Sequence, residues 1–315
     1  MYKKISVIVF LCGVLLSGCT AITSIAVTPE NEKIVIDGNI RLLAQLSDQV
    51  KETSGLAERN GLIWTINDSG DAPILYSLDS QHQILRKVRV SGAKNTDWED
   101  LAQDEVYLYI ADCGNNLGRR DNLEIYKVRW DQLEKSVSDE VPADILSFFY
   151  ADKPDTNLGR NHNYDCEALA SVGDELWLFT KNRGDQKTKL YKLNKEDAVQ
   201  RVSPVSGFDI KGLITAADYD PETKHLALLG YGKNILFGQS FIWVFPVVND
   251  GTLLPDWSRA RYKKLNPYAQ WEALIWDRDS SYPKLILTTE KSPLLDVSIG
   301  ELNVDFKDKG SGSEK

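Results

Sequence analysis

Short apolar runs alternate with polar turns along most of the chain, in a unit that recurs about every 50 residues. Each unit opens with a short motif of small residues and leucine, and an apolar run rich in β-branched and aromatic residues follows. The opening motifs are Glu52–Ala57, Asn95–Ala102, Tyr164–Ala170, Lys211–Ala217 and Gln270–Ile275. Repeated short strands of this kind predict an all-β chain that forms a single β-propeller.

The number of units predicts five blades. Six is the alternative, if the long segment Arg129–Asn163 contains a degenerate unit. Residues 33–37 and 39–46 are strand-like and precede the first unit, whereas the last unit, Trp271–Phe306, is one strand short. We therefore expect an N-terminal strand to complete the last blade and close the ring. The polar segment Ala151–Asn163 is expected to be a loop over one mouth of the central channel.

The N-terminus has the features of a targeting segment. Lys3 and Lys4 precede an apolar stretch, residues 5–16, that is too short to span a membrane comfortably. It ends in Leu16-Ser-Gly-Cys19, which resembles the lipobox of bacterial lipoproteins. The resemblance implies a signal peptide at 1–18 and fatty acylation (palmitate) of Cys19. The alternatives are an ordinary secretory signal and an uncleaved anchor.

Thr20 stands where that class places Asp for inner-membrane retention, so the resemblance implies the periplasmic face of the outer membrane. Residues 19–32 are then a tether, 33–307 the propeller, and 308–315 a disordered tail. The formal charge of -9 argues against nucleic acid as a partner. It is compatible with bound cations or with a merely solvated acidic surface. We expect a monomer that reaches the membrane through its lipid and binds a small ligand or an envelope protein.

Two cysteines remain in the mature domain. Cys113 follows one inner pair of strands and Cys166 begins the next unit. Neighbouring blades bring such positions together, and the periplasm is oxidising, so a disulfide is feasible. Two buried thiols are the alternative.

Acidic residues recur at one position of the opening motifs. If those motifs are innermost strands, Glu52, Glu99, Glu167 and Glu272 face the channel, with Thr215 in the fourth blade. Converging carboxylates suit calcium; alternatively, each accepts hydrogen bonds from backbone amides of the next blade. The ends of the second strands predict a ligand-binding set: Asn67, Asp112, Lys181, Tyr231 and Glu290.

Arginines follow the second strands at corresponding turns. Arg119, Arg120 and Arg183 are placed to hold an anionic ligand at the mouth or to bridge blades. His162 lies beside one unit and is a candidate base, or an ordinary loop histidine. No Gly-x-Ser-x-Gly motif and no histidine pair with metal-ligand spacing is present.

Several motifs carry a family resemblance. The series Asn67-Asp-Ser-Gly-Asp71, Asp97-Trp-Glu-Asp-Leu-Ala102, Asp112-Cys-Gly-Asn115 and Asp165-Cys-Glu-Ala-Leu169 resembles the bacterial periplasmic propellers called SdiA-regulated, and more distantly the esterase-like phytase propellers. Ile214-Thr215 departs from this pattern because it lacks the acid. The resemblance implies a propeller but little about activity.

Three functions remain open from the sequence. The first is a binding module that holds a ligand or partner at the channel mouth, with or without calcium. The second is a calcium-dependent hydrolase of the lactonase, esterase or phosphatase type. The third is an envelope scaffold that uses the outer faces of the blades.

Overall fold

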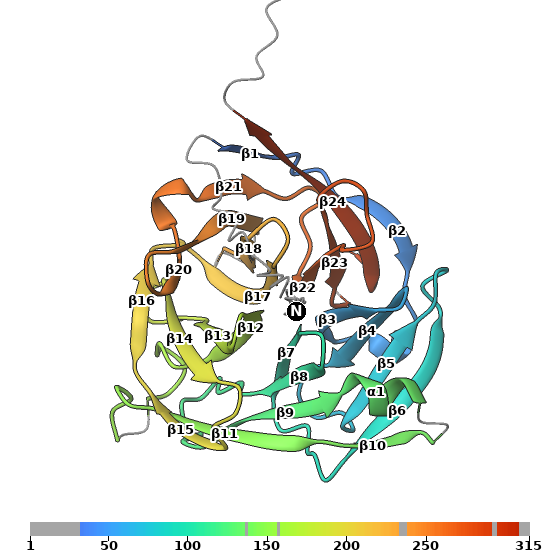
Figure 1. The fold of residues 1–315 in the computed structure, drawn as a ribbon, viewed down its shortest axis with the longest axis vertical. Coiled ribbons are helices and arrows are strands. Elements are labelled where there is room, and N and C mark those ends of the chain that lie inside the picture. Colours follow the sequence, from blue (N-terminus) through green and yellow to red (C-terminus); the bar gives the residue numbers. More distant parts are fainter. Residues whose placement is uncertain (1–31, 136–137, 156–157, 233–237, 292–294, 309–315) are drawn as a thin grey trace, which may run out of the picture.

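Five sheets surround a central channel in the computed structural model, which describes residues 32–135, 138–155, 158–232, 238–291 and 295–308 (Figure 1). Each sheet is one blade, so the prediction of a single five-bladed propeller is confirmed. The predicted signal peptide, the predicted lipidation site Cys19, and nearly all of the predicted tether and C-terminal tail lie outside the described residues. No helix within the described ranges is long and apolar enough to cross a membrane.

Strands succeed one another from the channel outward in the same order in every blade (Figure 1). The innermost strands are β3 (Thr53–Arg59), β7 (Trp98–Gln103), β12 (Cys166–Val172), β17 (Leu213–Asp220) and β22 (Trp271–Trp276). The second strands are β4 (Leu62–Asn67), β8 (Tyr107–Asp112), β13 (Glu175–Thr180), β18 (His225–Tyr231) and β23 (Lys284–Thr289). The third strands are β5 (Ile74–Leu78), β9 (Leu123–Arg129), β14 (Thr188–Asn194), β19 (Ser240–Asn249) and β24 (Ser298–Asp308).

Outer strands complete the first four blades. They are β6 (Ile84–Ser91), β11 (Asp144–Tyr150), β16 (Pro204–Phe208), β20 (Leu253–Pro255) and β21 (Arg261–Lys264). Two further strands, β10 (Glu140–Pro142) and β15 (Val199–Val202), pair in parallel with β6 and β11 of the preceding blade. Short helical turns are η1 (Asp48–Val50), α1 (Trp130–Lys135) and η2 (Trp257–Arg259).

The long segment between the second and third units is therefore not a sixth blade. It supplies α1, with Trp130 and Leu133 buried, then β10 to the first blade and β11 to the second. Its last part, the predicted loop, leads back to the channel mouth and into β12.

The N-terminal strands close the ring as predicted. Both β1 (Glu32–Ile36) and β2 (Arg41–Gln45) pair antiparallel with the long strand β24 of the last blade (Figure 1). The last blade thus joins the first residues of the domain to its last strand.

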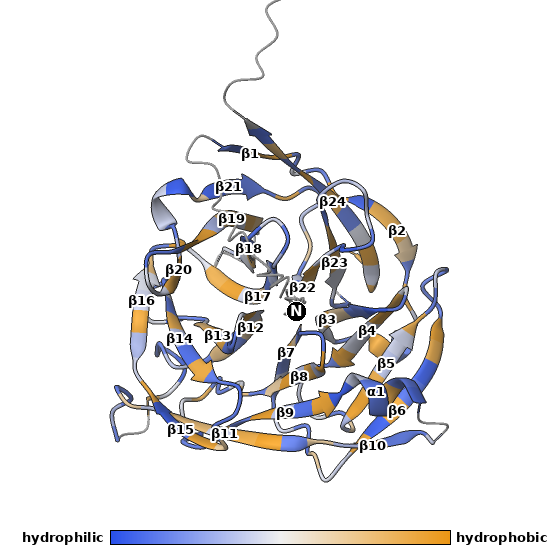
Figure 2. Ribbon diagram, viewed as in Figure 1, coloured by the Kyte–Doolittle hydropathy of each residue, from blue (hydrophilic) through white to orange (hydrophobic). Residues whose placement is uncertain are grey.

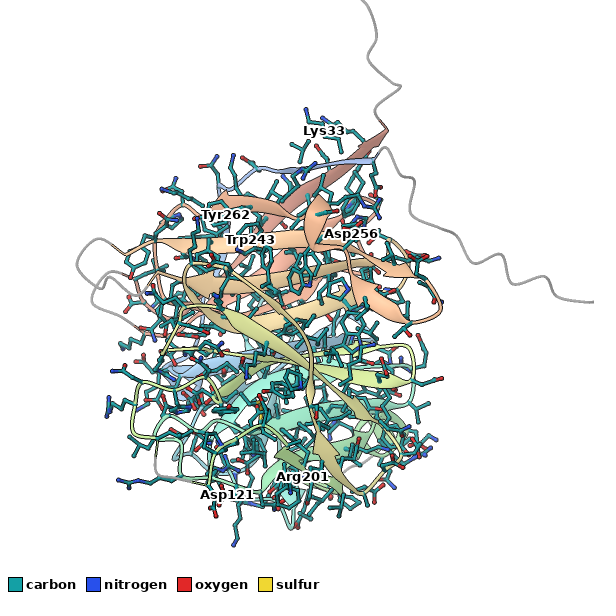
Figure 3. All side chains as sticks on the ribbon, turned by 90° about the vertical axis from the view of Figure 1, so that its left-hand side faces the viewer. Lys33, Asp121, Arg201, Trp243, Asp256 and Tyr262 are labelled. Atoms are coloured by element: carbon teal, nitrogen blue, oxygen red, sulfur yellow. A yellow bond between two sulfur atoms is a disulfide. The ribbon has the colours of Figure 1, made fainter. Side chains whose placement is uncertain are left out.

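Apolar side chains fill the spaces between adjacent blades. Figure 2 shows hydrophobic residues along the strands and hydrophilic residues in many of the connecting segments. Trp177 of the third blade, for example, shares one buried cluster with Ala217 and Phe245 of the fourth. On the outside of the fourth blade, Trp243 and Tyr262 contact each other with ring centroids 5.0 Å apart (Figure 3). Aromatic packing between and along blades is how the structure uses the recurring aromatic residues.

Side-chain hydrogen bonds join the innermost strands around the channel. Asp100 of β7, fully buried, accepts from the backbone N–H of Leu169 in β12 at 2.8 Å and of Ala217 in β17 at 3.1 Å. One carboxyl group therefore joins three blades. Its other oxygen accepts from Leu101 N at 2.8 Å.

Polar side chains close the rest of this ring. Asp218 of β17 accepts from Trp276 N of β22 at 2.8 Å, and Thr53 of β3 bonds to Thr288 of the last blade at 3.2 Å. Ser54 of β3 donates to the Glu99 carbonyl in β7. Every innermost strand is thus tied to a neighbouring blade by at least one side chain.

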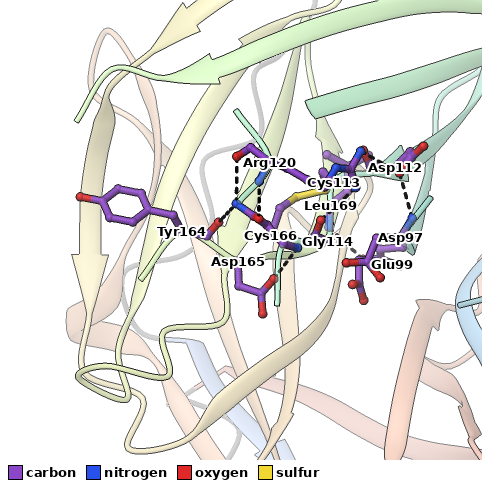
Figure 4. The surroundings of a disulfide bond; sticks show 12 residues. Asp97, Glu99, Asp112, Cys113, Gly114, Arg120, Tyr164, Asp165, Cys166 and Leu169 are labelled. Carbon is purple, nitrogen blue, oxygen red and sulfur yellow. Dashed lines mark hydrogen bonds and ion pairs between the residues drawn. A yellow bond between two sulfur atoms is a disulfide. The ribbon is translucent and has the colours of Figure 1, made fainter. Parts of the chain in front are cut away.

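A disulfide joins Cys113, just after β8, to Cys166, the first residue of β12 (Figure 4). It connects the second and third blades at the mouth where the innermost strands begin. The two residues are 53 positions apart in the sequence.

Replacing Asp100 with alanine is expected to lower the free energy of unfolding by about 3 kcal/mol or more, because two buried N–H groups of other blades lose their acceptor. Urea denaturation measures the change. Asp121→Ala, which removes an exposed carboxyl group, is the control and should change stability by less than about 1 kcal/mol. Equal stability of the two variants would contradict the role given to Asp100.

Loss of the disulfide is expected to lower the free energy of unfolding by about 2–4 kcal/mol, because it closes a long loop of the unfolded chain. The measurement is urea denaturation with and without a reductant. The Cys113→Ala/Cys166→Ala variant should be insensitive to the reductant. If reduction leaves the wild-type midpoint unchanged, the bond contributes no stability.

Candidate functional site

Each innermost strand has a β-bulge near its start, and the bulged residue belongs to the channel mouth. The bulged residues are Gly55, Glu99, Glu167, Thr215 and Glu272. Three of the four predicted glutamates thus occupy equivalent positions, and Thr215 holds the fourth blade as expected. Glu52 does not: it lies three residues before the bulge.

Backbone crowding explains why glycine occupies the first-blade position. Gly55 has a φ of +47°, and a Cβ on it would lie 2.3 Å from the backbone nitrogen of Leu101. A glutamate cannot be accommodated there, so the predicted ring of four glutamates has three.

The second predicted set needs one correction as well. One residue at or just after the end of each second strand lies opposite the position two residues before the bulge. These five residues are Asn67, Cys113, Lys181, Tyr231 and Glu290. Cys113, which forms the disulfide, replaces Asp112 in this set. Asp112 instead pairs with Arg120 at 3.0 Å and accepts from Asp97 N at 3.1 Å.

Lys181 is the buried cation of the channel mouth. Its Nζ donates to Glu167 Oε2 at 2.8 Å and lies 5.4 Å from the centre of the Tyr231 ring. Burial opposes its charge, but Glu167 and the neighbouring acids raise the pKa of Lys181 well above its usual value. Lys181 is therefore charged and committed to Glu167. Arg183 adds a second positive group, 3.7 Å from Glu167 Oε1.

Hydrogen bonds from neighbouring backbone amides are not how the glutamates are satisfied. Within the described ranges, no backbone N–H donates to a side-chain oxygen of Glu99, Glu167 or Glu272. Asp100 and Asp218 perform that structural role instead. No backbone hydrogen bond from a described residue therefore prevents these glutamate side chains from contacting a group in the channel.

A further group of carboxyls gathers beside Glu99. Oxygen atoms of Asp68, Asp97 and Glu99 all lie within 4.8 Å of one another. Asp68 comes from the turn after β4, and Asp97 immediately precedes β7; Figure 4 shows Asp97 next to Glu99. We did not predict Asp68 or Asp97 as ligands, although both belong to the motifs that drew attention to this region.

The carboxyl groups at this mouth resist ionisation because they are buried and close to one another. Burial and then Glu167 raise the pKa of Glu99 well above its usual value. Burial raises the pKa of Asp97 to about 6 and that of Glu272 to about 7. Burial and then Glu272 raise the pKa of Glu290 to about 9. These carboxyl groups therefore give up their protons at a higher pH than exposed carboxyl groups do.

An open pocket of about 450 Å³ adjoins the acids. Its lining residues are Ser69, Thr96, Asp97, Asn115, Asn116, Leu117, Arg119, Arg120 and Arg160. Arg120 is held in place by Asp112 and by the carbonyls of Asp112 and Gly114, each at 2.9 Å. Arg119 and Arg160 are exposed, and neither forms an ion pair with another described residue. One pocket is therefore lined by three arginines and by one acid, Asp97.

The remaining predicted residues lie around this pocket. Asn67 donates to the Gln49 carbonyl at 2.8 Å and to Asp71 at 2.5 Å, which fixes the turn after β4. His162 is buried, its Nδ1 accepts from Tyr164 N at 3.0 Å, and burial lowers its pKa. Because His162 is not among the pocket's lining residues, the geometry adds no support for its role as a base.

Stability is expected to fall as pH rises from about 5 to about 9 in the presence of a chelator. Glu272 and Glu290 release their protons near 4.5 when unfolded but only near 7 and 9 when folded, so protonation stabilises the fold. Each such carboxyl lowers the free energy of unfolding by about 1.4 kcal/mol per pH unit between its two pKa values. Urea denaturation across this range tests the slope. Glu290→Gln should flatten it above about pH 7, and an unchanged slope would rule this carboxyl out as its cause.

Neither a protein-family model nor a curated protein sequence matches the chain. Among solved structures, the catalytic domain of a GH62 α-L-arabinofuranosidase from Coprinopsis cinerea is similar with a TM-score of 0.50 and 10% identity, over 87% of this chain and 97% of that one. A 6-phosphogluconolactonase candidate from Bacteroides uniformis has a TM-score of 0.38 and 10% identity, over 84% and 90%. A chain of Kuenenia stuttgartiensis hydrazine synthase has 0.38 and 10%, over 77% of this chain and 65% of that one. The first likeness supports the propeller fold alone, and the other two carry no argument.

Proposed function

We propose that this protein is a lipid-anchored binding module whose propeller holds a small anionic ligand at the channel mouth. The observation that carries the proposal is the 450 Å³ pocket, in which Arg119 and Arg160 stand free beside the fixed Arg120. Exposed arginines that lack carboxylate partners and converge on one pocket suit an oxyanion, because guanidinium groups bind carboxylates and phosphates in a two-pronged geometry.

The rest of the pocket suits a polar molecule of modest size. Asn115 and Asn116 contribute amide groups, and Ser69 and Thr96 contribute hydroxyl groups. Asn115 is fixed because its N–H donates to Asp165 at 2.7 Å and its side-chain oxygen accepts from Arg120 N at 2.9 Å. A site whose groups are held in advance loses little entropy on binding.

The proposed location follows from the sequence. The Leu16-Ser-Gly-Cys19 motif with Thr20 after it supports an outer-membrane lipoprotein that faces the periplasm. The repeat motifs support kinship with the SdiA-regulated propellers. In that setting the module would retain or sense a soluble periplasmic anion.

Hydrolysis is the second candidate, favoured by the acids that face the arginines across the pocket. An anionic substrate held by Arg119 and Arg160 would place its neighbouring bond near Asp97 and Glu99. A cation at these acids would polarise the substrate and activate water.

Binding is tested with three probes that share an oxyanion: inorganic phosphate, glucuronate and glucose 6-phosphate. We expect at least one to bind by calorimetry, and Arg119→Gln/Arg160→Gln to weaken it about tenfold or more. Arg201→Gln is the matched control because Arg201 is exposed on β15 at the outer edge of the second blade (Figure 3).

The outcomes separate the candidates. Equal loss of affinity in the control, or no binding of any probe, would overturn the anion site. Release of phosphate from glucose 6-phosphate that disappears in the double variant would establish the hydrolase instead.

A further inference from the structure

Five carboxyl groups and two cations at the channel mouth divide into two halves. In one half, Lys181 and Arg183 neutralise Glu167, and Arg183 also pairs with Asp165. In the other half, no ion pair with a described residue reaches Asp68, Asp97 or Glu99. Lys181 and Arg183 therefore neutralise acids on one side of the mouth only.

Glu99 shows most clearly that this half lacks a partner. The residue is 4% exposed, and its Oε1 is buried with no hydrogen-bond partner in the described structure. Asp97 and Asp68 each have a carboxyl oxygen within 4.8 Å of a Glu99 oxygen, and Figure 4 shows the Asp97 side chain next to Glu99. A buried carboxylate oxygen without a donor is unfavourable unless something positive occupies the adjoining space.

We propose that Asp68, Asp97 and Glu99 form a calcium site. Their oxygens lie within 4.8 Å of one another. Oxygens that bind one calcium ion at about 2.3–2.6 Å are separated by at most about twice that distance, so the spacing fits. Three carboxylates supply three to six ligand oxygens, and water from the adjoining pocket completes the shell.

The ligand chemistry of this site suits calcium better than magnesium or zinc. All three ligands are carboxylates, Asp97 and Glu99 from one segment and Asp68 from another, whereas magnesium demands a near-ideal octahedron and usually keeps several waters. Zinc would prefer nitrogen or sulfur ligands, which these positions lack.

Gly114 shapes the site from the other side. A Cβ on this residue would lie 2.0 Å from Glu99 Oε1 and 2.5 Å from Asp97 Oδ2. The backbone of the turn after β8 thus passes against the two carboxyls, and only glycine leaves their oxygens where they are. The same turn bears Arg119 and Arg120, so it would contact both the cation and the anion.

The calcium site and the proposed anion site lie at the same mouth. The calcium site rests on the proposed function in no other respect. A calcium ion at Asp97 would face the pocket and could bind an oxyanion that Arg119 and Arg160 hold from the opposite wall. Calcium binding is measured without any anionic probe, so either proposal can fail while the other stands.

The test is calorimetric titration of the chelator-treated protein with calcium chloride, and separately with magnesium chloride, near pH 7.5. We expect one calcium site with at least tenfold weaker magnesium binding. Asp97→Asn and Glu99→Gln should each weaken calcium about thirtyfold or more. Glu272→Gln, a buried glutamate at the equivalent bulge outside the triad, is the matched control and should change affinity less than about threefold.

Thermal unfolding without calcium separates ligand loss from misfolding. Glu99→Gln replaces a buried carboxyl group whose Oε1 has no donor in the described structure, so it should unfold at or above the wild-type temperature in chelator, yet gain no stability from calcium. Gly114→Ala keeps all three acids and should still weaken calcium about tenfold. No calcium binding by the wild type, or full affinity in Glu99→Gln, would overturn the site; an equal loss in Glu272→Gln would overturn its assignment to this triad.

Discussion

The carboxyl group of Asp100 is the interaction on which the arrangement of the channel depends. It accepts backbone N–H groups from β12 and β17 while it belongs to β7, so it fixes three innermost strands at one level. Asp218 joins β17 to β22, and the hydroxyls of Ser54 and Thr53 join β3 to its two neighbouring blades. Neighbouring blades therefore cannot slide relative to one another without breaking buried hydrogen bonds.

A fixed level has a consequence for the mouth. Because the bulges of all five strands stand at the same height, Glu99, Glu167 and Glu272 converge rather than spread along the channel. One lysine, Lys181, is placed to neutralise them, and it bonds to Glu167. Adjacent residues therefore have different roles. Asp100 accepts hydrogen bonds that join the blades, whereas its neighbour Glu99 faces the cavity.

The fold was predictable from the sequence because each blade repeats one pattern, and the ring closure followed from the strand missing in the last unit. The site was predictable only in part. Glu52 was assigned to the ring as the acid of the first opening motif, and sequence spacing cannot show that the bulge falls on Gly55, three residues later. Asp68 and Asp97 lie outside the strands, where no repeat relates them; only the folded turns bring them to Glu99.

Buried acids at the two ends of the channel differ in their hydrogen-bond partners, and this contrast supports a functional mouth at one end. At the far end, Asp218 receives two bonds from the Arg278 side chain, at 2.9 and 3.0 Å, and one from Trp276 N. At the near end, Glu99 keeps an oxygen without any such donor. The fold supplies hydrogen-bond donors to both oxygens of the buried Asp218 carboxyl, so it is able to supply a donor to a buried carboxyl in another blade. The proposed calcium site accounts for the Glu99 oxygen that lacks one.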